Sequence, residues 1–410
     1  MRFKSARKGE ELKIKKRKVQ FSFWPMGKGI KHEKLHSTLF VSDPWQVIEK
    51  QIRQMDSEEK KNINKKKEKV SKTNSNKLPN FSEVITELMQ AIHAFEDIQK
   101  VKKQALHHLR QAKDFHKSME NSDTNAAKPL LLYYCFLNLA KCFIIYKERK
   151  SLPDKLYHGI TEDLGDNKIT VKKGLKNNAF KHFSRALLGE EVKYSKEISQ
   201  KDFLSQILVG HRVYCQSQVV NFKEKFISLE EIHFRQDKHA STVWLLARAV
   251  RHDFNRIDQK IGDLEKSLNH SRLTWENVNK ENTGYGSGYV FAQMGNPKKY
   301  KQKPSSVLND LSLKASRRLW RIVTSHPPYR KYYIYIPDEN EKLLHQLLSI
   351  YLATFYFGSI TRYKPSEFDA LLKGEMGAFI HEFFESQPNQ FLYLMASEFM
   401  EQEVTKAAVV

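Results

Sequence analysis

The stretch Lys128–Lys150, KPLLLYYCFLNLAKCFIIYKERK, is the densest apolar run in the chain. Proline at the second position suits the first turn of a helix, where its missing N–H costs nothing. Nearly every position from Leu130 to Tyr146 is apolar or aromatic, which is typical of a helix buried on most faces. Asn138 and Lys141 interrupt the run, and about 16 residues with a lysine near the middle are short for a bilayer span. We therefore expect the central core helix of a soluble domain.

A second, longer helix is predicted just upstream, from Asn80 to about Asn121. Apolar residues recur there at spacings of three and four between Val84 and Phe115, which indicates one amphipathic helix. Asn80 followed by Glu83 resembles a capping box. A polar break after Asn121 separates this helix from the apolar run, so the two should form an antiparallel helical hairpin.

The segments before this hairpin differ in character. Ser42 to Met55 reads as a short helix, with Asp43 and Pro44 at its start. Residues 57–80 are rich in lysine and asparagine and almost without apolar side chains, so burial cannot offset their ordering entropy, and we expect a disordered or frayed linker. The predicted division is a basic arm (1–41), a short helix (42–56), this linker (57–80) and a helical domain (81–410).

The second half of the chain is predicted from turn and strand signals. Tyr332–Ile336 (YYIYI) is the clearest strand, Arg251–Lys280 reads as a charged helix, and 232–250 is ambiguous between helix and strand. Glycines 284, 286 and 288 indicate a tight turn, because the lysine of a phosphate-binding loop is missing. Three helices follow, about 341–357, 367–385 and 389–404, punctuated by Pro365 and Pro388. The expected fold is mainly α, a helical bundle around a long helical hairpin with a small β element.

The charge of the chain is large and unevenly placed. Its net charge is +23, and residues 1–80 hold 22 Lys and Arg against 9 Asp and Glu. So basic a balance indicates an anionic partner, nucleic acid first and a membrane surface second. In the arm, lysines and arginines stand next to aromatic residues that could stack on bases, although a solvated arm or a docked strand would show the same pattern. The candidate nucleic-acid-binding residues are Lys13, Lys15, Lys16, Arg17, Lys18 and Trp24.

Other classes of site find little support. Cys135, Cys142 and Cys215 lack a CxxC spacing, so we expect buried structural thiols and a reducing, cytoplasmic environment. No histidine and cysteine spacing fits a zinc site, and we expect no metal, no cofactor, no secretory signal and no membrane span.

Two arginine–histidine spacings are compatible with metal-independent RNA cleavage. Arg110 and His116 have five residues between them on the long predicted helix, and Arg321 and His326 have four. Helical RNA-cleaving domains of the HEPN type, which this pattern resembles, use such a pair to stabilise a charged phosphate and move a proton. Arg110 and His116 are the candidate catalytic pair. Arg362 and Lys128 are candidates for anion binding, with a structural role, such as capping carbonyls or pairing with Glu382, as the alternative.

Several motifs together resemble the YaaC-like family of bacterial proteins. They are the start of the apolar run from Lys128 to Lys141, then His158-Gly159, then GSITRYKP at 358–365 and QFLYLMASEF at 390–399. The resemblance covers about Ser42 to Val404. It implies a mostly helical bacterial intracellular protein, with some members similar to HEPN-like domains and genome defence as a candidate role.

Three functional hypotheses follow. The first is a cytoplasmic, nucleic-acid-associated protein whose arm contacts phosphates, with membership of a defence system as its candidate role. The second is a metal-independent endoribonuclease that uses Arg110 and His116. The third is a non-catalytic scaffold that forms a homo-oligomer or binds a protein partner. Salt-sensitive binding, RNA cleavage in EDTA and a mass in solution above 48.2 kDa would distinguish them.

Overall fold

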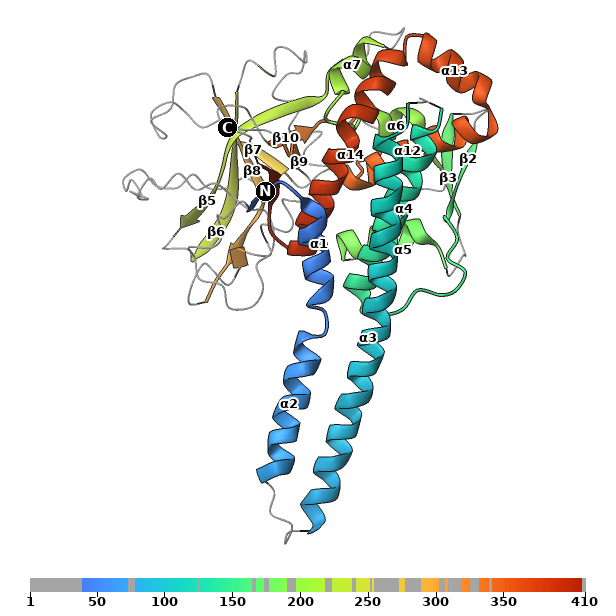
Figure 1. Cartoon of the computed structure of the whole chain (residues 1–410). Coiled ribbons are helices and arrows are strands. Elements are labelled where there is room, and N and C mark those ends of the chain that lie inside the picture. Colours follow the sequence, from blue (N-terminus) through green and yellow to red (C-terminus); the bar gives the residue numbers. More distant parts are fainter. Residues whose placement is uncertain are drawn as a thin grey trace.

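The computed structural model describes residues 39–407, except 73–77, 124–125, 164–166, 173–176, 190–196, 218–222, 238–240, 251–252, 254–272, 277–288, 302–306, 309–310, 312–318, 325–331 and 339–340. Helices make up most of the regular structure and surround a central apolar helix, with small sheets beside them (Figure 1). The predicted mainly α fold with a small β element is confirmed.

The described chain starts with a short strand and a capped helix. Strand β1 (Leu39–Val41) pairs in parallel with β11 (Val404–Lys406), so the two ends of the described chain lie side by side. Helix α1 (Pro44–Arg53) begins after Asp43, whose Oδ1 accepts the Trp45 N–H at 2.9 Å. The short helix predicted from Asp43 and Pro44 is therefore confirmed.

The segment predicted to be a disordered linker is instead helical over most of its length. Helix α2 (Ser57–Lys72) has Glu58 and Glu59 in its first turn, where carboxylates stabilise the helix dipole. Ile63 is buried, and Lys66 donates to the backbone oxygen of Glu87 at 3.0 Å. The expectation was wrong because one narrow contact with the neighbouring helix is enough to hold a segment that is otherwise polar.

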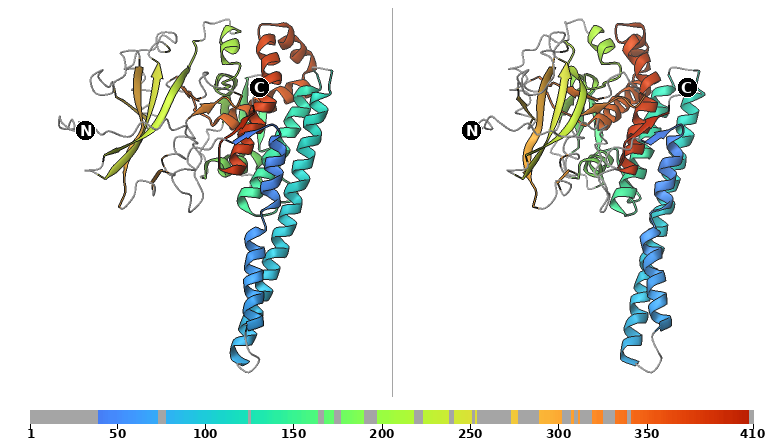
Figure 2. Two further views of the ribbon diagram at one scale, coloured as in Figure 1. Left: turned by 60° about the vertical axis from the view of Figure 1, so that its left-hand side comes forward. Right: turned by 90° about the vertical axis from the view of Figure 1, so that its left-hand side faces the viewer.

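Two long helices form the predicted hairpin. Helix α3 (Leu78–Glu120) runs for 43 residues, and its second half packs along α4 (Lys128–Glu148). Its first half pairs with α2 instead, and these two segments project from the body of the protein (Figures 1 and 2). We call α2 and residues 78–94 the projecting hairpin.

Helix α4 is the centre of the core, as its sequence predicts. Helices α12 (Gln346–Tyr363) and α14 (Gly377–Met400) pack against it. Phe136 of α4 stacks on Phe391 of α14, with ring centroids 3.8 Å apart. A Cβ at Gly358 of α12 would lie 3.3 Å from the Cβ of Tyr133, so glycine permits this close approach. Among the described residues, α4 is the one helix long and apolar enough to cross a membrane, and 72% of its most apolar window is buried inside the protein.

The C-terminal helices differ from the prediction in where they break. Helix α13 (Pro365–Lys373) begins at Pro365 as expected, but the next break lies at 374–376 and α14 continues through Pro388. Proline inside a helix removes one backbone hydrogen bond. Pro388 and its neighbour Gln387 are both buried, and the Gln387 amide donates to the oxygen of Val209 at 3.0 Å. Tertiary packing therefore holds the helix together where local signals predict its end.

A small sheet and three short helices cover the body near α4. Strands β2 (Ile160–Asp163), β3 (Lys168–Val171) and β4 (Glu197–Ser199) form a three-stranded antiparallel sheet. The accompanying helices are α5 (Ala179–Leu188), α6 (Gln200–Leu204) and α7 (His211–Gln216). Phe183 of α5 packs edge-on against Phe143 of α4, which joins this layer to the core.

A larger antiparallel sheet lies to one side of the helices, in the order β7-β8-β6-β5-β10-β9. Its strands are β5 (Phe226–Asp237), β6 (Thr242–Val250), β7 (Leu273–Glu276), β8 (Tyr289–Lys299), β9 (Trp320–Arg321) and β10 (Tyr332–Tyr335). The strand predicted from YYIYI is confirmed, and the ambiguous segment 232–250 is strand in β5, up to Asp237, and in β6, from Thr242. The helix predicted over 251–280 is wrong at β7, where pairing with β8 holds an extended backbone. The rest of that segment and the glycine-rich turn lie almost entirely outside the described residues.

Candidate functional site

The predicted catalytic pair lies on one helix but not at one place. Arg110 and His116 are both in α3, where six residues turn a helix by about 120° net. Arg110 is exposed, whereas His116 is 7% exposed. No hydrogen bond joins the two side chains within the described part of the chain, so the structure does not bring this pair together.

His116 has the surroundings of a core histidine. Its ring lies edge-on to Trp45 of α1, with centroids 5.5 Å apart, and its Nδ1 is 3.3 Å from Glu120. Burial lowers its pKa although Glu120 favours the charged form. These contacts fix α1 on α3, so a His116→Ala substitution would remove core packing as well as an imidazole. The ribonuclease reading with these two residues stays a prediction that the geometry does not favour.

Arg321, the arginine of the second predicted arginine–histidine pair, has a structural role. Arg321 in β9 is buried, pairs with Glu403 at 3.1 Å and donates to the backbone oxygen of Val404 at 2.9 Å. Its guanidinium also donates to the Ser397 hydroxyl at 2.7 Å. These bonds tie the larger sheet to the end of α14 and to β11. His326 lies outside the described residues.

The two candidate anion-binding residues lie at one end of the α4–α12 pair. Lys128 begins α4, and Arg362 lies in the last turn of α12, one turn beyond Gly358. Arg362 is exposed, and its guanidinium lies 5.2 Å from the ring centre of Tyr363. Neither side chain has a hydrogen bond or ion pair within the described residues, so the predicted pairing of Arg362 with Glu382 is not formed there.

The candidate nucleic-acid-binding residues of the arm lie outside the described residues. They are Lys13, Lys15, Lys16, Arg17, Lys18 and Trp24, all in the range 1–38. Nothing in the structure therefore tests them, and their role stays a prediction.

A described basic surface lies on α2. This helix has seven lysines against three glutamates. We call its exposed lysines the lysine face: Lys60, Lys61, Lys65, Lys67 and Lys69. Helix α2, which carries these lysines, is part of the projecting hairpin (Figure 2). Sequence analysis singled out this composition but read it as a linker, although Glu58 and Glu59 at its start were a helix signal.

Only some lysines of this face have a carboxylate nearby that balances their positive charge. Lys60 is 3.0 Å from the Asp56 carboxylate and Lys69 is 3.7 Å from Glu87. Lys61, Lys65 and Lys67 have no hydrogen bond or ion pair within the described residues. Exposed lysines of this kind are solvated in the free protein and can exchange water and counterions for phosphate oxygens.

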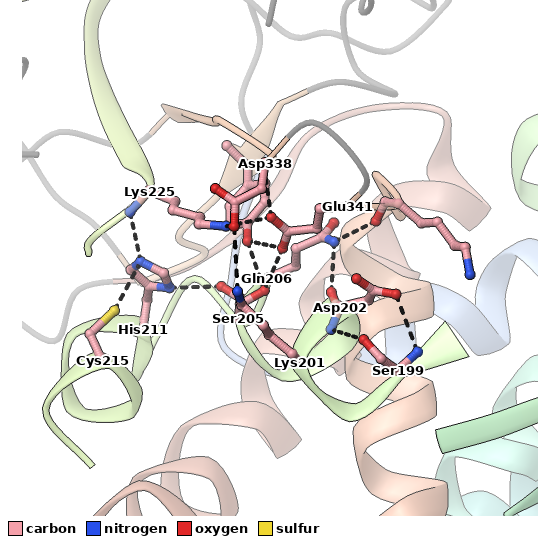
Figure 3. Close-up of polar contacts among 12 residues, drawn as sticks. Ser199, Lys201, Asp202, Ser205, Gln206, His211, Cys215, Lys225, Asp338 and Glu341 are labelled. Carbon is pink, nitrogen blue, oxygen red and sulfur yellow. Dashed lines mark hydrogen bonds and ion pairs between the residues drawn. The ribbon is translucent and has the colours of Figure 1, made fainter. Parts of the chain in front are cut away.

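A buried polar cluster lies where the larger sheet meets α6 and α7 (Figure 3). The ammonium of Lys225, the residue just before β5, lies 2.5 Å from Glu341 and 2.6 Å from Asp338. Glu341 also accepts hydrogen bonds from the hydroxyls of Ser205, at 2.8 Å, and Tyr335. Both carboxylate oxygens of Glu341 thus have hydrogen-bond donors, and the cluster joins the start of β5, β10, the end of α6 and the segment before α12.

A histidine and a cysteine beside this cluster are also structural. His211 Nδ1 lies 2.7 Å from the backbone oxygen of Ser205, while its Nε2 accepts the backbone N–H of Lys225 at 2.9 Å. These bonds require a neutral imidazole with its proton on Nδ1. Cys215 Sγ lies 3.4 Å from Nε2, and burial raises the pKa of the thiol to about 11. A thiol so far from ionisation is a poor nucleophile.

The remaining cysteines fit their prediction. Cys135 and Cys142 are buried in α4, unpaired, and burial raises the pKa of both thiols above its usual range. Within the described residues no three His, Cys, Asp or Glu side chains are grouped so that they could hold a metal ion.

A model of the YaaC-like protein family matches residues 86–399. The chain belongs to the YaaC-like family. No curated protein and no solved structure matches it.

The extent of the YaaC-like match separates two parts of the molecule. It includes α4, the three-stranded sheet, the six-stranded sheet and nearly all of α12 to α14. It also covers the motifs at 128–141, 158–159, 358–365 and 390–399. It begins within α3, so the arm and the whole of α2 precede it. The lysine face is therefore an addition to the YaaC-like body of this chain.

Proposed function

We propose that this YaaC-like protein associates with nucleic acid and that the lysine face of α2 contacts the phosphate backbone. One observation carries the proposal: Lys61, Lys65 and Lys67 are exposed, have no partner in the described structure and stand on a hairpin that projects from the body. A projecting basic helix can approach a polyanion without steric conflict with the rest of the protein. The arm, which adds further positive charge, would extend the same contact.

The mechanism is electrostatic and independent of base sequence. Each lysine that contacts a phosphate releases condensed counterions, so the logarithm of affinity falls with the logarithm of salt by about 0.9 per contact on duplex DNA and about 0.7 on single strands. A cytoplasmic location and a part in bacterial defence, which the family resemblance implies, stay predictions.

Reversing the charge of the lysine face tests the proposal. In a Lys61→Glu, Lys65→Glu, Lys67→Glu variant, we expect weaker binding of fluorescent RNA and DNA and a salt slope reduced by about 2 on single strands and about 3 on duplex DNA, because three contacts are lost. Fluorescence anisotropy at salt concentrations from about 50 to about 200 mM measures both quantities.

A matched variant controls for net charge. Lys117, Lys373 and Lys406 are exposed lysines scattered over the body, and changing all three to glutamate alters the net charge by the same amount. This control should bind nearly as the wild type does. Equal weakening in both variants, or an unchanged slope in the first, would contradict a specific role for the lysine face.

The same experiment distinguishes the other hypotheses. Cleavage of the RNA in EDTA would favour the ribonuclease. The absence of binding at any salt, together with a mass in solution above 48.2 kDa, would favour the scaffold.

A further inference from the structure

A pocket of about 490 Å³ lies in the YaaC-like body, far along α3 from the lysine face. Gln104 and His108 of α3 and Lys141 of α4 form part of its lining, and the segment 152–157 that follows α4 completes it. Its volume falls in the range of small-molecule sites, about 300 to 1,000 Å³. None of the predicted site residues lines it.

Lys141 is the first unusual group in this pocket. It is half-buried in the otherwise apolar α4, and burial lowers its pKa. It has no hydrogen bond or ion pair within the described residues. A half-buried, unpaired ammonium destabilises the folded state, whereas a leucine or methionine at this position would not. Packing therefore does not explain why this position is a lysine.

His108 is the second unusual group, and its hydrogen bonds fix its tautomer. The Asn138 amide donates to the Tyr134 backbone oxygen at 2.9 Å, so Asn138 Oδ1 faces His108 and lies 3.0 Å from its Nδ1. Nδ1 therefore holds the proton and donates. Burial lowers the pKa of His108, and the charge of Lys141 lowers it further. The imidazole is thus neutral, with an unprotonated Nε2 that has no described protein partner.

Gln104 and Tyr157 complete the set. Gln104 Oε1 accepts the Leu152 backbone N–H at 2.9 Å, which holds the segment 152–157 over the pocket. Its amide N–H groups are left without a partner in the described structure. Tyr157 lines the pocket and is 52% exposed, so its ring can stack on a planar group in the ligand.

We propose that this pocket binds a phosphate monoester, with Lys141 and Gln104 donating to phosphate oxygens and His108 Nε2 accepting the remaining phosphate proton. The arrangement supplies one cation, neutral donors and one acceptor, which matches the monoanion of a phosphate monoester. The site does not depend on the lysine face. The monoester belongs either to a small molecule such as a nucleotide or to the phosphorylated end of a nucleic acid.

Other charged and titratable groups surround these two residues. On α3, His107 lowers the pKa of His108 by its charge. In the segment after α4, Asp154 and Lys155 line the pocket. Burial lowers the pKa of His158, and the charges of Lys141 and Arg362 lower it further. The charge of Glu162 raises it. The cations Lys141, Lys155 and Arg362 outnumber the carboxylates of Asp154 and Glu162, and this balance favours an anionic ligand.

Isothermal titration calorimetry with adenosine monophosphate and with adenosine tests the proposal. The wild type should bind the monophosphate at least about tenfold more tightly, because charge-assisted hydrogen bonds to phosphate are lost in the nucleoside. Lys141→Met should abolish this preference while keeping or raising the melting temperature, since it removes an unpaired half-buried charge. The matched control Lys117→Met should bind as the wild type does.

The pH dependence tests the role of His108. A phosphate monoester has a second pKa of about 6, so lowering the pH from about 7.5 to about 6 increases the monoanion that His108 recognises. Wild-type affinity should rise over this range, and His108→Asn should lose or invert the rise. Equal affinity for nucleotide and nucleoside, an unchanged preference in Lys141→Met, or the same pH profile in His108→Asn would each overturn the proposal.

Two oligonucleotides identify the source of the monoester. Preference for a 5′-phosphorylated over a 5′-hydroxyl oligonucleotide, abolished by Lys141→Met, would assign the pocket to a nucleic-acid end. Preference for the mononucleotide alone would assign it to a small molecule. Salt-dependent binding of the 5′-hydroxyl oligonucleotide should be unchanged in Lys141→Met. A failure of the pocket proposal can therefore be distinguished from a failure of the lysine-face proposal.

Discussion

Asp56 illustrates how one carboxylate can fix the geometry of two helices. It lies between α1 and α2 with its side chain 2% exposed, and it accepts hydrogen bonds from Lys102, at 2.9 Å, and Gln99 of α3. Burial alone would raise its pKa, but the bonds from Lys102, Lys60 and Gln99 together lower it to about 2. The carboxylate therefore stabilises the start of the projecting hairpin in its ionised form.

This lowered pKa predicts an acid-dependent loss of stability. The pKa falls from 3.8 to about 2 on folding, so the ionised group contributes about 2 kcal/mol at neutral pH, and that contribution is lost as the pH falls from about 4 to about 2. Asp56→Asn should cost about 2 kcal/mol at pH 7 and almost nothing at about pH 2. Urea unfolding at several pH values measures this difference, and a cost that is constant with pH would contradict the assignment.

At the same scale, the residues with unusual chemistry were visible in the sequence as exceptions to a pattern. Asn138 and Lys141 interrupt the apolar run of α4. Their partners could not be read from the sequence, because Asn138 binds His108 from the other helix of the hairpin. His116 shows the converse, because its spacing from Arg110 resembles an RNA-cleaving pair while its ring packs edge-on against Trp45.

At the scale of elements, the Lys225–Glu341 pair joins the larger sheet to the helical body. The two side chains are 6% and 3% exposed. Two buried charges stabilise the structure only as a pair, because either one alone is left without compensation in a medium of low polarity.

A double-mutant cycle should show this coupling between the elements. Lys225→Met leaves Glu341 buried without a cation and should cost about 3 to 5 kcal/mol in the free energy of unfolding. Glu341→Gln should cost less, because Asp338 still lies 2.6 Å from the Lys225 ammonium. The double variant should cost much less than the sum of the two. Chemical denaturation gives the three values, and additive costs would show that the pair does not couple the sheet to α6 and α12.

The elements whose prediction failed share a cause. α2 is helical although it has few apolar residues, because Ile63 and the ion pairs of Lys66 and Lys69 lie against α3. α14 continues through Pro388 because Pro388 and its neighbour Gln387 are buried in the body. In each element a tertiary contact outweighs a local propensity of about 1 to 3 kcal/mol.

At the scale of the whole molecule, the projecting hairpin is separable from the core. Its buried residues Ile63, Val84 and Ala91 pack between α2 and α3 and not in the main hydrophobic core. The core instead gathers around α4, from α1 and the second half of α3 to α14. The hairpin therefore adds surface and charge without supporting the body.

Removing the end of the hairpin should leave a folded protein. If residues 61–94 are replaced by a short Gly/Ser loop, the melting temperature of the body should change by less than about 4 °C, because about 1 kcal/mol or less is lost from the core. Circular dichroism measures the melt, and anisotropy should show reduced salt-dependent binding of nucleic acid. Loss of a cooperative transition would show that the hairpin supports the core.

The sequence by itself determined the central hairpin, the capped first helix, the strand at 332–335 and the membership of the YaaC-like family. These features depend on periodic apolar patterns and on capping residues, which act within a few residues of the chain. Only the tertiary structure decided that 57–72 is a helix carrying a basic face, that His116 belongs to the core, and that His108 and Lys141 share a pocket. Those outcomes depend on contacts between residues far apart in sequence, such as Lys225 with Glu341, and no local pattern encodes such pairings.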